Sequence, residues 1–350
     1  MKTRSQRTGS NGPALLASEA TGSKDHTMTL RHVFSWKFLF YDALLPLLRR
    51  LGPSRCDAVL AGLGRLASAW PPTKAAQIAA METARDALGA DWDVRAARKA
   101  LAANVARFVA RDYPLDGLTR DEVFSRFDIQ GFEHLESTLA QGRGAILLGC
   151  HLGAYLAGVH WLYRTGAPVR LLVQRPGHVS GFLNEQIHRA DTPHPQSGFF
   201  LRRRMPAGEG AERLVRARMA LRDGLAVYLS GDIPWPSCHA RPGRFLGQSR
   251  PFQSVWAELS SITAAPVVPI FCLHQPGGRY ALRFDPPFHP NPATAVPQYL
   301  ERLESLIAAH PSEAVAHLTW PCYLEAGDAL PIPPPARPSF LAPAPLVAEG

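Results

Sequence analysis

The sequence has few cysteines and none of the short motifs that mark the commonest enzyme chemistries. Its five cysteines are scattered and form no C-x-x-C pair; they are Cys56, Cys150, Cys238, Cys272 and Cys322. An odd, unpaired set argues against a disulfide framework and a cysteine-based zinc site, and it is typical of a reducing compartment. The chain also lacks H-E-x-x-H, Walker, G-x-S-x-G and G-x-G-x-x-G sequences. The sequence therefore carries no motif that would indicate a metalloprotease, a nucleotide-binding fold or an α/β-hydrolase.

Charge is also sparse. Only 19% of the 350 residues are charged, whereas 46% are hydrophobic. This composition excludes a disordered chain or a coiled coil and suffices for a sizeable core. The net charge of +9 fits plain solubility, or an anionic partner such as nucleic acid, anionic lipid or an acidic carrier protein. Since the basic residues accompany no recognition motif, we expect no nucleic acid partner.

Four segments differ in composition. Residues 1–28 are rich in Ser, Thr, Gly and basic residues, which predicts a disordered N-terminus without a secretory signal. Residues 29–120 are predicted to form a helical region. Residues 121–325 carry alternating strand and helix patterns and are predicted to form an α/β domain. The proline-rich tail, residues 326–350, is predicted to be extended or disordered.

The longest apolar stretch lies within residues 30–51, which are rich in aromatic side chains and have the basic flanks Arg31, Arg49 and Arg50. The stretch is interrupted and falls short of the roughly 20 apolar residues that cross a bilayer. We therefore expect a helix that lies in the membrane interface or anchors weakly. A core-facing helix of a soluble domain is the alternative.

A short continuous apolar run predicts a buried strand at residues 144–150. Further strands are predicted at residues 168–174, 225–231, 266–273 and 279–285. Helical periodicity predicts helices at residues 209–224, 252–265 and 298–318. Strands that alternate with helices predict an α/β layer structure with a largely parallel sheet.

His151 follows the first of these strands directly and is a candidate catalytic base. Ligands of open parallel α/β sheets bind beyond the carboxyl ends of the strands, although a histidine at a strand end also fits a structural role. In an alternating strand Cys150 points the other way, so we do not propose a thiol nucleophile. His160 falls on roughly the opposite face of the following helix and is interpreted as structural.

Several motifs, each weak by itself, follow one another in an order that is typical of one known superfamily. They are G-F-E-H-L at 131–135, H-L-G at 151–153, G-D at 231–232 and A-P-V-V-P at 265–269. Over about residues 128–290 the sequence thereby resembles the lysophospholipid acyltransferase superfamily, most closely its late lipid A (lauroyl and myristoyl) acyltransferase branch.

The resemblance implies a mixed sheet flanked by helices and a peripheral membrane enzyme at the cytoplasmic face of the inner membrane. It implies that an acyl chain passes from acyl carrier protein or coenzyme A to a hydroxyl of a lipid or glycolipid. His151 falls on the family's catalytic histidine, and no metal or redox cofactor is expected.

One position departs from the family pattern. The family places an Asp or Glu five residues after the histidine, and here that residue is Leu156. Three explanations are open: another acid replaces it, a base-only mechanism suffices, or the protein is catalytically silent and binds lipid or acyl carrier. Asp232, after the third predicted strand, is the candidate substitute, although Gly-Asp there also fits a simple turn.

Basic residues supply the candidate substrate contacts. Arg202, Arg203 and Arg204 loosely match a superfamily block that holds the acceptor's phosphate, since guanidinium groups suit phosphates. Arg244 belongs to a second basic group that could meet an acidic carrier or lipid head groups. A solvated basic loop is the alternative reading of both. Gly153, from the His-x-Gly motif, completes the predicted substrate-binding set.

Overall fold

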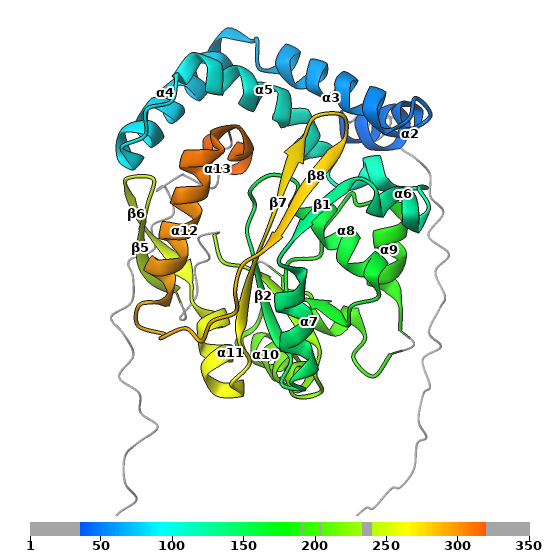
Figure 1. Ribbon diagram of the computed structural model, residues 1–350, viewed down its shortest axis with the longest axis vertical. Helices are drawn as coiled ribbons and strands as arrows, with labels where there is room; N and C mark the ends of the chain where they lie inside the picture. Colours follow the sequence, from blue (N-terminus) through cyan, green and yellow to red (C-terminus); the bar gives the residue numbers. More distant parts are fainter. Residues whose placement is uncertain (1–35, 191, 203–204, 233–239, 320–350) are drawn as a thin grey trace, which may run out of the picture.

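The computed structural model describes residues 36–190, 192–202, 205–232 and 240–319 (Figure 1). The predictions for residues 1–28 and 326–350 lie outside these ranges. The centre of the fold is a six-stranded sheet in the order β1-β8-β7-β2-β4-β3. Its strands are β1 (Phe127–Gln130), β2 (Ala145–Gly149), β3 (Val169–Leu171), β4 (Ala226–Ser230), β7 (Val267–Gln275) and β8 (Arg279–Phe284).

Most neighbouring strands of this sheet are parallel. β2 pairs in parallel with both β4 and β7, and β3 pairs in parallel with β4. The exception is the antiparallel pair of β7 and β8, which are joined by a tight turn. β1 then pairs in parallel with β8. The prediction of a mixed, largely parallel sheet is confirmed.

Helices cover both faces of the sheet. On β2, Ile146 and Leu148 belong to one buried cluster, whereas Ala145 and Leu147 belong to another, as alternation in a strand requires. The first cluster includes residues from α10 (Ala207–Arg222), α11 (Val255–Thr263) and α12 (Ala295–Ala309). The second includes residues from α7 (Phe132–Ala140), α8 (Tyr155–Thr165) and α9 (Gly181–His188). Buried on both faces, β2 needs the unbroken apolar run that predicted it.

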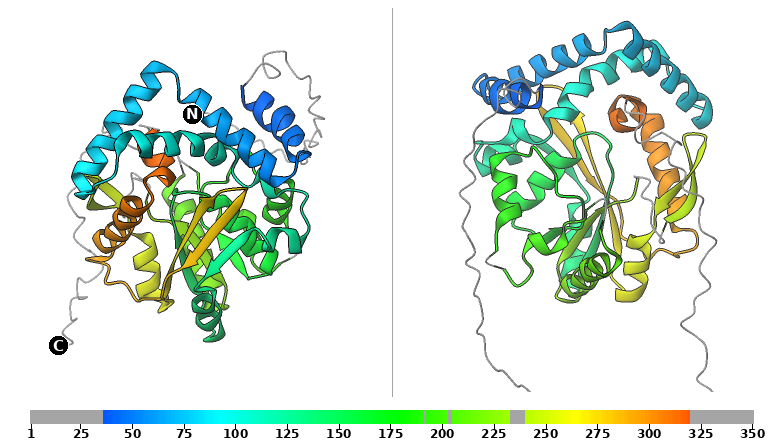
Figure 2. Two further views of the ribbon diagram at one scale, coloured as in Figure 1. Left: turned by 45° about the horizontal axis from the view of Figure 1, so that its top comes forward. Right: turned by 180° about the vertical axis from the view of Figure 1, so that it is seen from behind.

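A layer of N-terminal helices runs across the end of the sheet at which β2 and β7 finish (Figures 1 and 2). It consists of η1 (Phe38–Leu44), α2 (Leu45–Arg49), α3 (Pro53–Ala67), α4 (Pro71–Leu88) and α5 (Val94–Ala110). α3 crosses α5 closely at Gly64, where a Cβ would lie 2.3 Å from the carbonyl oxygen of Ala102. Glycine is therefore required at this crossing.

Two predicted helices differ from the structure. The helix predicted over residues 298–318 is broken before Pro311, because proline cannot donate the backbone hydrogen bond that would continue it. The chain there forms α12, a 3-10 turn η4 (Pro311–Glu313) and α13 (Val315–Thr319). The helix predicted from residue 252 begins at Val255, since residues 252 and 253 end a strand.

That strand belongs to a two-stranded hairpin, β5 (Ala240–Phe245) and β6 (Gln248–Gln253). Leu246 and Gly247 connect the two strands with positive φ angles of 48° and 76°, the backbone that a tight two-residue hairpin turn demands. The remaining short elements are η2 (Tyr113–Leu115), α6 (Arg120–Phe124) and η3 (Gln196–Phe199). Among the described residues, no helix combines the length and apolar content needed to cross a membrane.

Candidate active site

His151 stands in a tight turn between β2 and α8. Gly153 has a φ of 59°, and a Cβ there would lie 2.4 Å from the carbonyl oxygen of Cys272 on β7, so only glycine fits. The N–H groups of Gly153 and Ala154 donate to the carbonyls of Glu313 and Cys272. The turn is thereby fixed to two neighbouring segments. Gly153 acts through backbone shape, and its own amide is already used within the protein.

Asp232 meets His151 because β2 and β4 are parallel neighbours. Their register pairs Gly149 with Ser230, and each functional residue comes two positions after its strand ends. Oδ1 of Asp232 lies 3.0 Å from Nδ1 of His151, and Oδ2 accepts the backbone N–H of His151 at 2.6 Å. One carboxylate therefore holds both the ring and the backbone of the histidine.

The electrostatics of the pair favour an ionised Asp232. Its side chain is fully buried, whereas that of His151 is 15% exposed. Burial alone would raise the pKa of Asp232, but the charge and hydrogen bond of His151, together with His317, hold this pKa well below its usual range. A carboxylate at Nδ1 favours the tautomer with the proton on Nδ1 and the lone pair on Nε2. This is the arrangement of a histidine base with an orienting acid.

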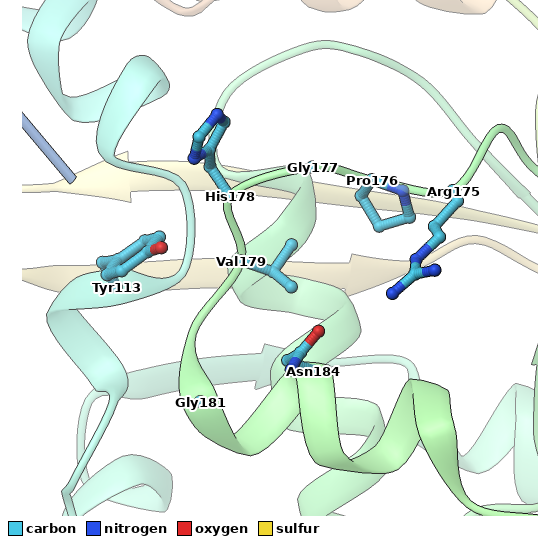
Figure 3. Close-up of a pocket in the computed structure, with 8 residues that line it drawn as sticks. All are labelled: Tyr113, Arg175, Pro176, Gly177, His178, Val179, Gly181 and Asn184. Carbon is cyan, nitrogen blue, oxygen red and sulfur yellow. The ribbon is translucent and has the colours of Figure 1, made fainter. Parts of the chain in front are cut away.

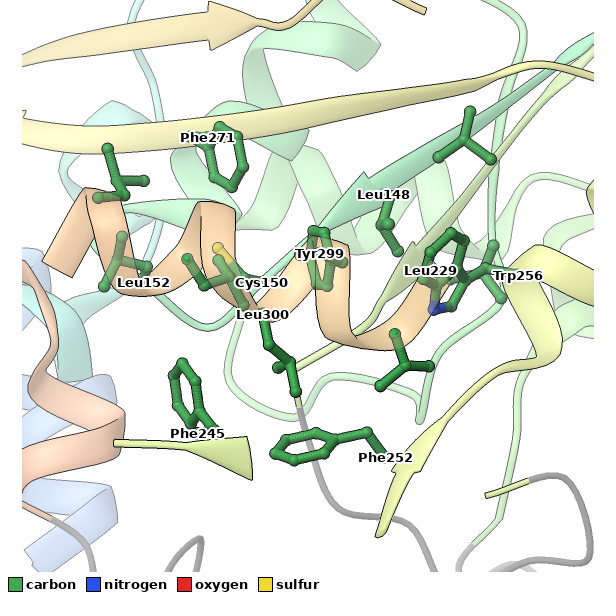
Figure 4. Packing of buried hydrophobic residues seen from close by; sticks show 14 of the residues in the cluster. Leu148, Cys150, Leu152, Leu229, Phe245, Phe252, Trp256, Phe271, Tyr299 and Leu300 are labelled. Atoms are coloured by element: carbon green, nitrogen blue, oxygen red, sulfur yellow. The ribbon is translucent and has the colours of Figure 1, made fainter. Parts of the chain in front are cut away.

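Neighbouring residues are arranged around this contact. A Cβ at Gly231 would lie 2.7 Å from the ring of Tyr299, so glycine lets the chain pass and present Asp232. Tyr299 donates a hydrogen bond to the carbonyl of Gly149 at 2.7 Å. Figure 4 shows Cys150 and Tyr299 among apolar side chains beside α12. Burial raises the pKa of the Cys150 thiol well above its ordinary value, as expected of a packed rather than a nucleophilic cysteine.

Comparison with known families agrees with this geometry. The model of the bacterial lipid A biosynthesis acyltransferases matches residues 23–315 of the chain. The chain belongs to this family. A search of curated proteins returned no match. The protein is accordingly assigned to the acyltransferases, with substrates of the lipid A type.

In this member of the family the position of the usual motif acid is apolar. Leu156 is 5% exposed and packs in the buried cluster beneath α8. Asp232 reaches the histidine from β4 instead. Asp232 thus lies where a substitute for the missing acid would have to lie.

The predicted arginine contacts are only partly described. Arg202 is exposed and pairs with Glu209 at 2.5 Å, so its charge is shared with a carboxylate of the same molecule. Arg203 and Arg204 lie outside the described residues. Arg244 is exposed on β5, beside the buried Phe245. In the part of the chain that the structure describes, no hydrogen bond or ion pair joins Arg202 or Arg244 to His151.

A hollow of about 550 Å³ lies beyond the end of β3, between η2 and α9 (Figure 3). Its lining includes Tyr113, Arg175, Val179 and Asn184, and His151 is not among the lining residues. Sequence reasoning did not select Arg175, although it directly follows the predicted strand 168–174. The strand-end rule that selected His151 could have found it.

Sequence reasoning also missed His317, which has no motif around it. Its Nε2 lies 3.0 Å from Oδ2 of Asp232, although off the direction of a regular hydrogen bond. His317 lies on α13, which follows the break at Pro311 and packs on α4 and α5. No local pattern in the sequence signals that contact.

Proposed function

We propose that this protein transfers a fatty acyl group from the thioester of acyl carrier protein or coenzyme A to a hydroxyl of a lipid A-type acceptor. His151 is the general base and Asp232 orients it. The observation that carries the proposal is the pair itself: a partly exposed histidine at the carboxyl end of β2, held on Nδ1 by a buried carboxylate.

The chemistry follows from that pairing. Nε2 of His151 takes the proton of the acceptor hydroxyl as its oxygen attacks the thioester carbonyl, and the imidazolium that forms is stabilised by Asp232. Collapse of the tetrahedral intermediate breaks the carbon–sulfur bond, and the imidazolium returns its proton to the leaving thiolate. General base catalysis contributes about 10²–10⁴-fold. The transfer exchanges a thioester for an ester, so it requires no redox cofactor.

The proposal includes a location at the cytoplasmic face of the inner membrane. An exposed apolar surface supports the membrane contact itself. The surface lies on the N-terminal helix layer and includes Trp36, Leu39, Leu47, Leu51, Val59, Leu66 and Trp70. Exposed cations accompany it, namely Lys37, Arg50, Arg55 and Arg65, whereas Asp42 is an exposed acid there. Apolar side chains beside cations suit an anionic bilayer.

This surface is close to the candidate site. The ring of His151 lies 4.7 Å from that of Tyr155, which in turn lies 5.8 Å from Phe108 on α5. α3, which carries Val59 and Leu66, packs directly on α5. A bilayer on the outer face of α3 would thus lie one helix layer from the base, a short path for a lipid acceptor.

The test is acyl transfer from labelled acyl carrier protein and from acyl-coenzyme A into total membrane lipid and purified lipid A precursors. We expect transfer by the wild type and its loss in His151→Ala, with rates expressed per folded molecule and thermal melts to show that the variant is folded. The more active of the two thioesters identifies the donor. Equal background signal in wild type and variant, with both donors, would instead indicate the silent lipid- or acyl-carrier-binding protein.

The membrane proposal has a separate test, flotation with phosphatidylglycerol and with phosphatidylcholine vesicles. The double variant Leu66→Glu and Trp70→Glu should float less with the anionic vesicles, because it replaces apolar contact by like charge. Ile262→Glu is a matched control, since Ile262 is 63% exposed on α11, at the opposite end of the molecule from α3 (Figure 1). Equal flotation of the double variant and the control would contradict a membrane contact through α3.

A further inference from the structure

We propose that His317 is a positioning residue that holds Asp232 in the orientation His151 needs. The inference rests on the proposed function, because it assigns a role in the same base mechanism. It concerns a residue outside the motif region, on the last described helix, α13.

One carboxylate joins two imidazoles from distant parts of the chain. Oδ1 of Asp232 faces Nδ1 of His151, and Oδ2 faces Nε2 of His317 at 3.0 Å. Rotation of the carboxylate about its Cβ–Cγ bond would move both oxygens together. Oδ2 also accepts the backbone N–H of His151 at 2.6 Å. The contact from His317 is a second restraint on Oδ2, and through the carboxylate it restrains where Oδ1 and the ring of His151 point.

Burial and ring packing restrain the side chain of His317. Its side chain is 3% exposed and packs edge-on against Phe245, with ring centroids 5.2 Å apart at an angle of 78°. The Asp232 side chain is wholly buried. An ionised carboxylate at such a site is stable only with donors around it. Nε2 of His317 supplies a polar contact to Oδ2 at 3.0 Å, although off the direction of a regular hydrogen bond.

In two other histidine–carboxylate pairs, the second carboxylate oxygen is contacted by a donor that is not a histidine. Asp112 faces the ring of His160 with one oxygen and accepts the N–H of Ser180 with the other. Glu313 faces the ring of His274 and accepts the Nδ2 amide of Asn104 on its other oxygen. In each pair a donor from a third segment contacts the oxygen that does not face the ring.

At Asp232 a third-segment contact to Oδ2 comes from a histidine. Unlike Arg or Lys, an imidazole does not place a permanent positive charge beside the carboxylate, and such a charge would compete with the imidazolium that forms at His151. The choice of a histidine therefore suits a carboxylate whose task is to stabilise a transient cation rather than to complete a static ion pair.

The test compares His317→Leu, which keeps the volume and removes the donor, with His317→Gln, whose amide nitrogen reaches the place of Nε2. Since outer partners of catalytic groups affect rates by roughly 10–100-fold, His317→Leu should lower kcat at least tenfold. KM should stay within about twofold, because buried His317 meets no substrate. His317→Gln should recover most of kcat. His317→Asn, whose amide is too short to reach Oδ2, should not.

A second readout does not depend on turnover. In protein labelled with ¹⁵N-histidine, the side-chain nitrogen shifts report the tautomer of His151, assigned by comparison with His151→Ala. The wild type and His317→Gln should show the Nδ1–H tautomer, and His317→Leu and His317→Asn should show a mixture.

An unchanged His151 tautomer in His317→Leu, or equal loss of kcat in the Gln and Asn variants, would overturn the positioning role. Absence of turnover in the wild type would count against the proposed function alone, because the tautomer readout would still decide the role of His317. Thermal melts show which variants are folded. If His317→Leu does not fold, the comparison of His317→Gln with His317→Asn decides the question.

Discussion

The molecule contains two closely similar pairs, His151–Asp232 and His160–Asp112, and they differ in what surrounds the ring. In both, a fully buried carboxylate lies 3.0 Å from Nδ1 of the histidine. The side chain of His151 is 15% exposed, whereas that of His160 is fully buried. Nε2 of His160 also accepts a hydrogen bond from Arg164 at 3.3 Å. The lone pair that a base would use is thus occupied within the protein.

The comparison shows that a histidine–carboxylate contact alone does not identify a base. The His160 pair ties together segments far apart in sequence, since Asp112 also binds the backbone of Ser180 at the start of α9. Its function is to fix α8 and α9 to the chain that follows α5. The His151 pair has the same chemistry at an open strand end, where a substrate can approach. Access therefore separates the two roles.

The largest expected effect separates the two histidines. His151→Ala should reduce acyl transfer per folded molecule by about 10²–10⁴-fold, with some loss of stability as well, because it removes one partner of the buried Asp232. His160→Ala should lower the free energy of unfolding by about 3–5 kcal/mol, since it leaves Asp112 buried without its partner, while the folded fraction keeps its kcat. Turnover per folded molecule and urea denaturation measure the two quantities. Loss of turnover in folded His160→Ala would remove the distinction.

The next effect separates the two acids. Asp232→Asn keeps the shape but no longer favours the Nδ1–H tautomer of His151, and the corresponding change in a triad enzyme lowers kcat by about 10⁴-fold. We expect a smaller loss here, about 10²-fold, because His317 and the turn still restrain the site. Asp112→Asn should leave kcat near the wild-type value and reduce stability instead. Initial rates at saturating donor and acceptor, corrected for folded protein, measure this. Full activity of Asp232→Asn would favour the base-only mechanism.

Part of this arrangement could be predicted from the sequence. Apolar runs predict strands β2, β4 and β7, because strands buried on both faces carry few polar side chains. β3 and β8 were also predicted, although β8 alternates between buried and exposed residues. His151 and Asp232 each follow such a run and so fall at the binding edge of the sheet. The sequence also favoured His151, from its place after a strand, over His160, which the helical angle puts on the opposite face.

The rest depended on contacts that no local pattern encodes. The order of strands in the sheet makes β2 and β4 neighbours, and only that order brings Asp232 to His151. The short strand β1 and the exposed hairpin of β5 and β6 lack a continuous apolar run, so they were not predicted. His317 reaches Asp232 through the packing of α13 against α4 and α5, which the pattern of residues 298–318 does not reveal.

The smallest effect concerns acid stability, and it contrasts a buried acid with an exposed one. The pKa of Asp232 is lower in the folded protein than in an unfolded chain, where it is about 3.9. The folded state therefore binds fewer protons at this group, and the stability it contributes is complete above about pH 4 and is lost as the pH falls below that value. Asp232→Asn removes this contribution, so its stability should fall less steeply between about pH 4 and 2.

Asp223→Asn is the matched control, because Asp223 also pairs with a histidine, His194, at 2.6 Å, yet its side chain is 60% exposed. Its pH profile should follow that of the wild type, since solvent screens an exposed pair. Urea denaturation at closely spaced pH values below 6 measures the slopes. Equal slopes for wild type and Asp232→Asn would mean that Asp232 is held no more firmly in the folded protein than in the unfolded chain. In that case the carboxylate could not serve as a fixed partner for a charged His151, and the distinction between the open pair and a surface ion pair would be lost.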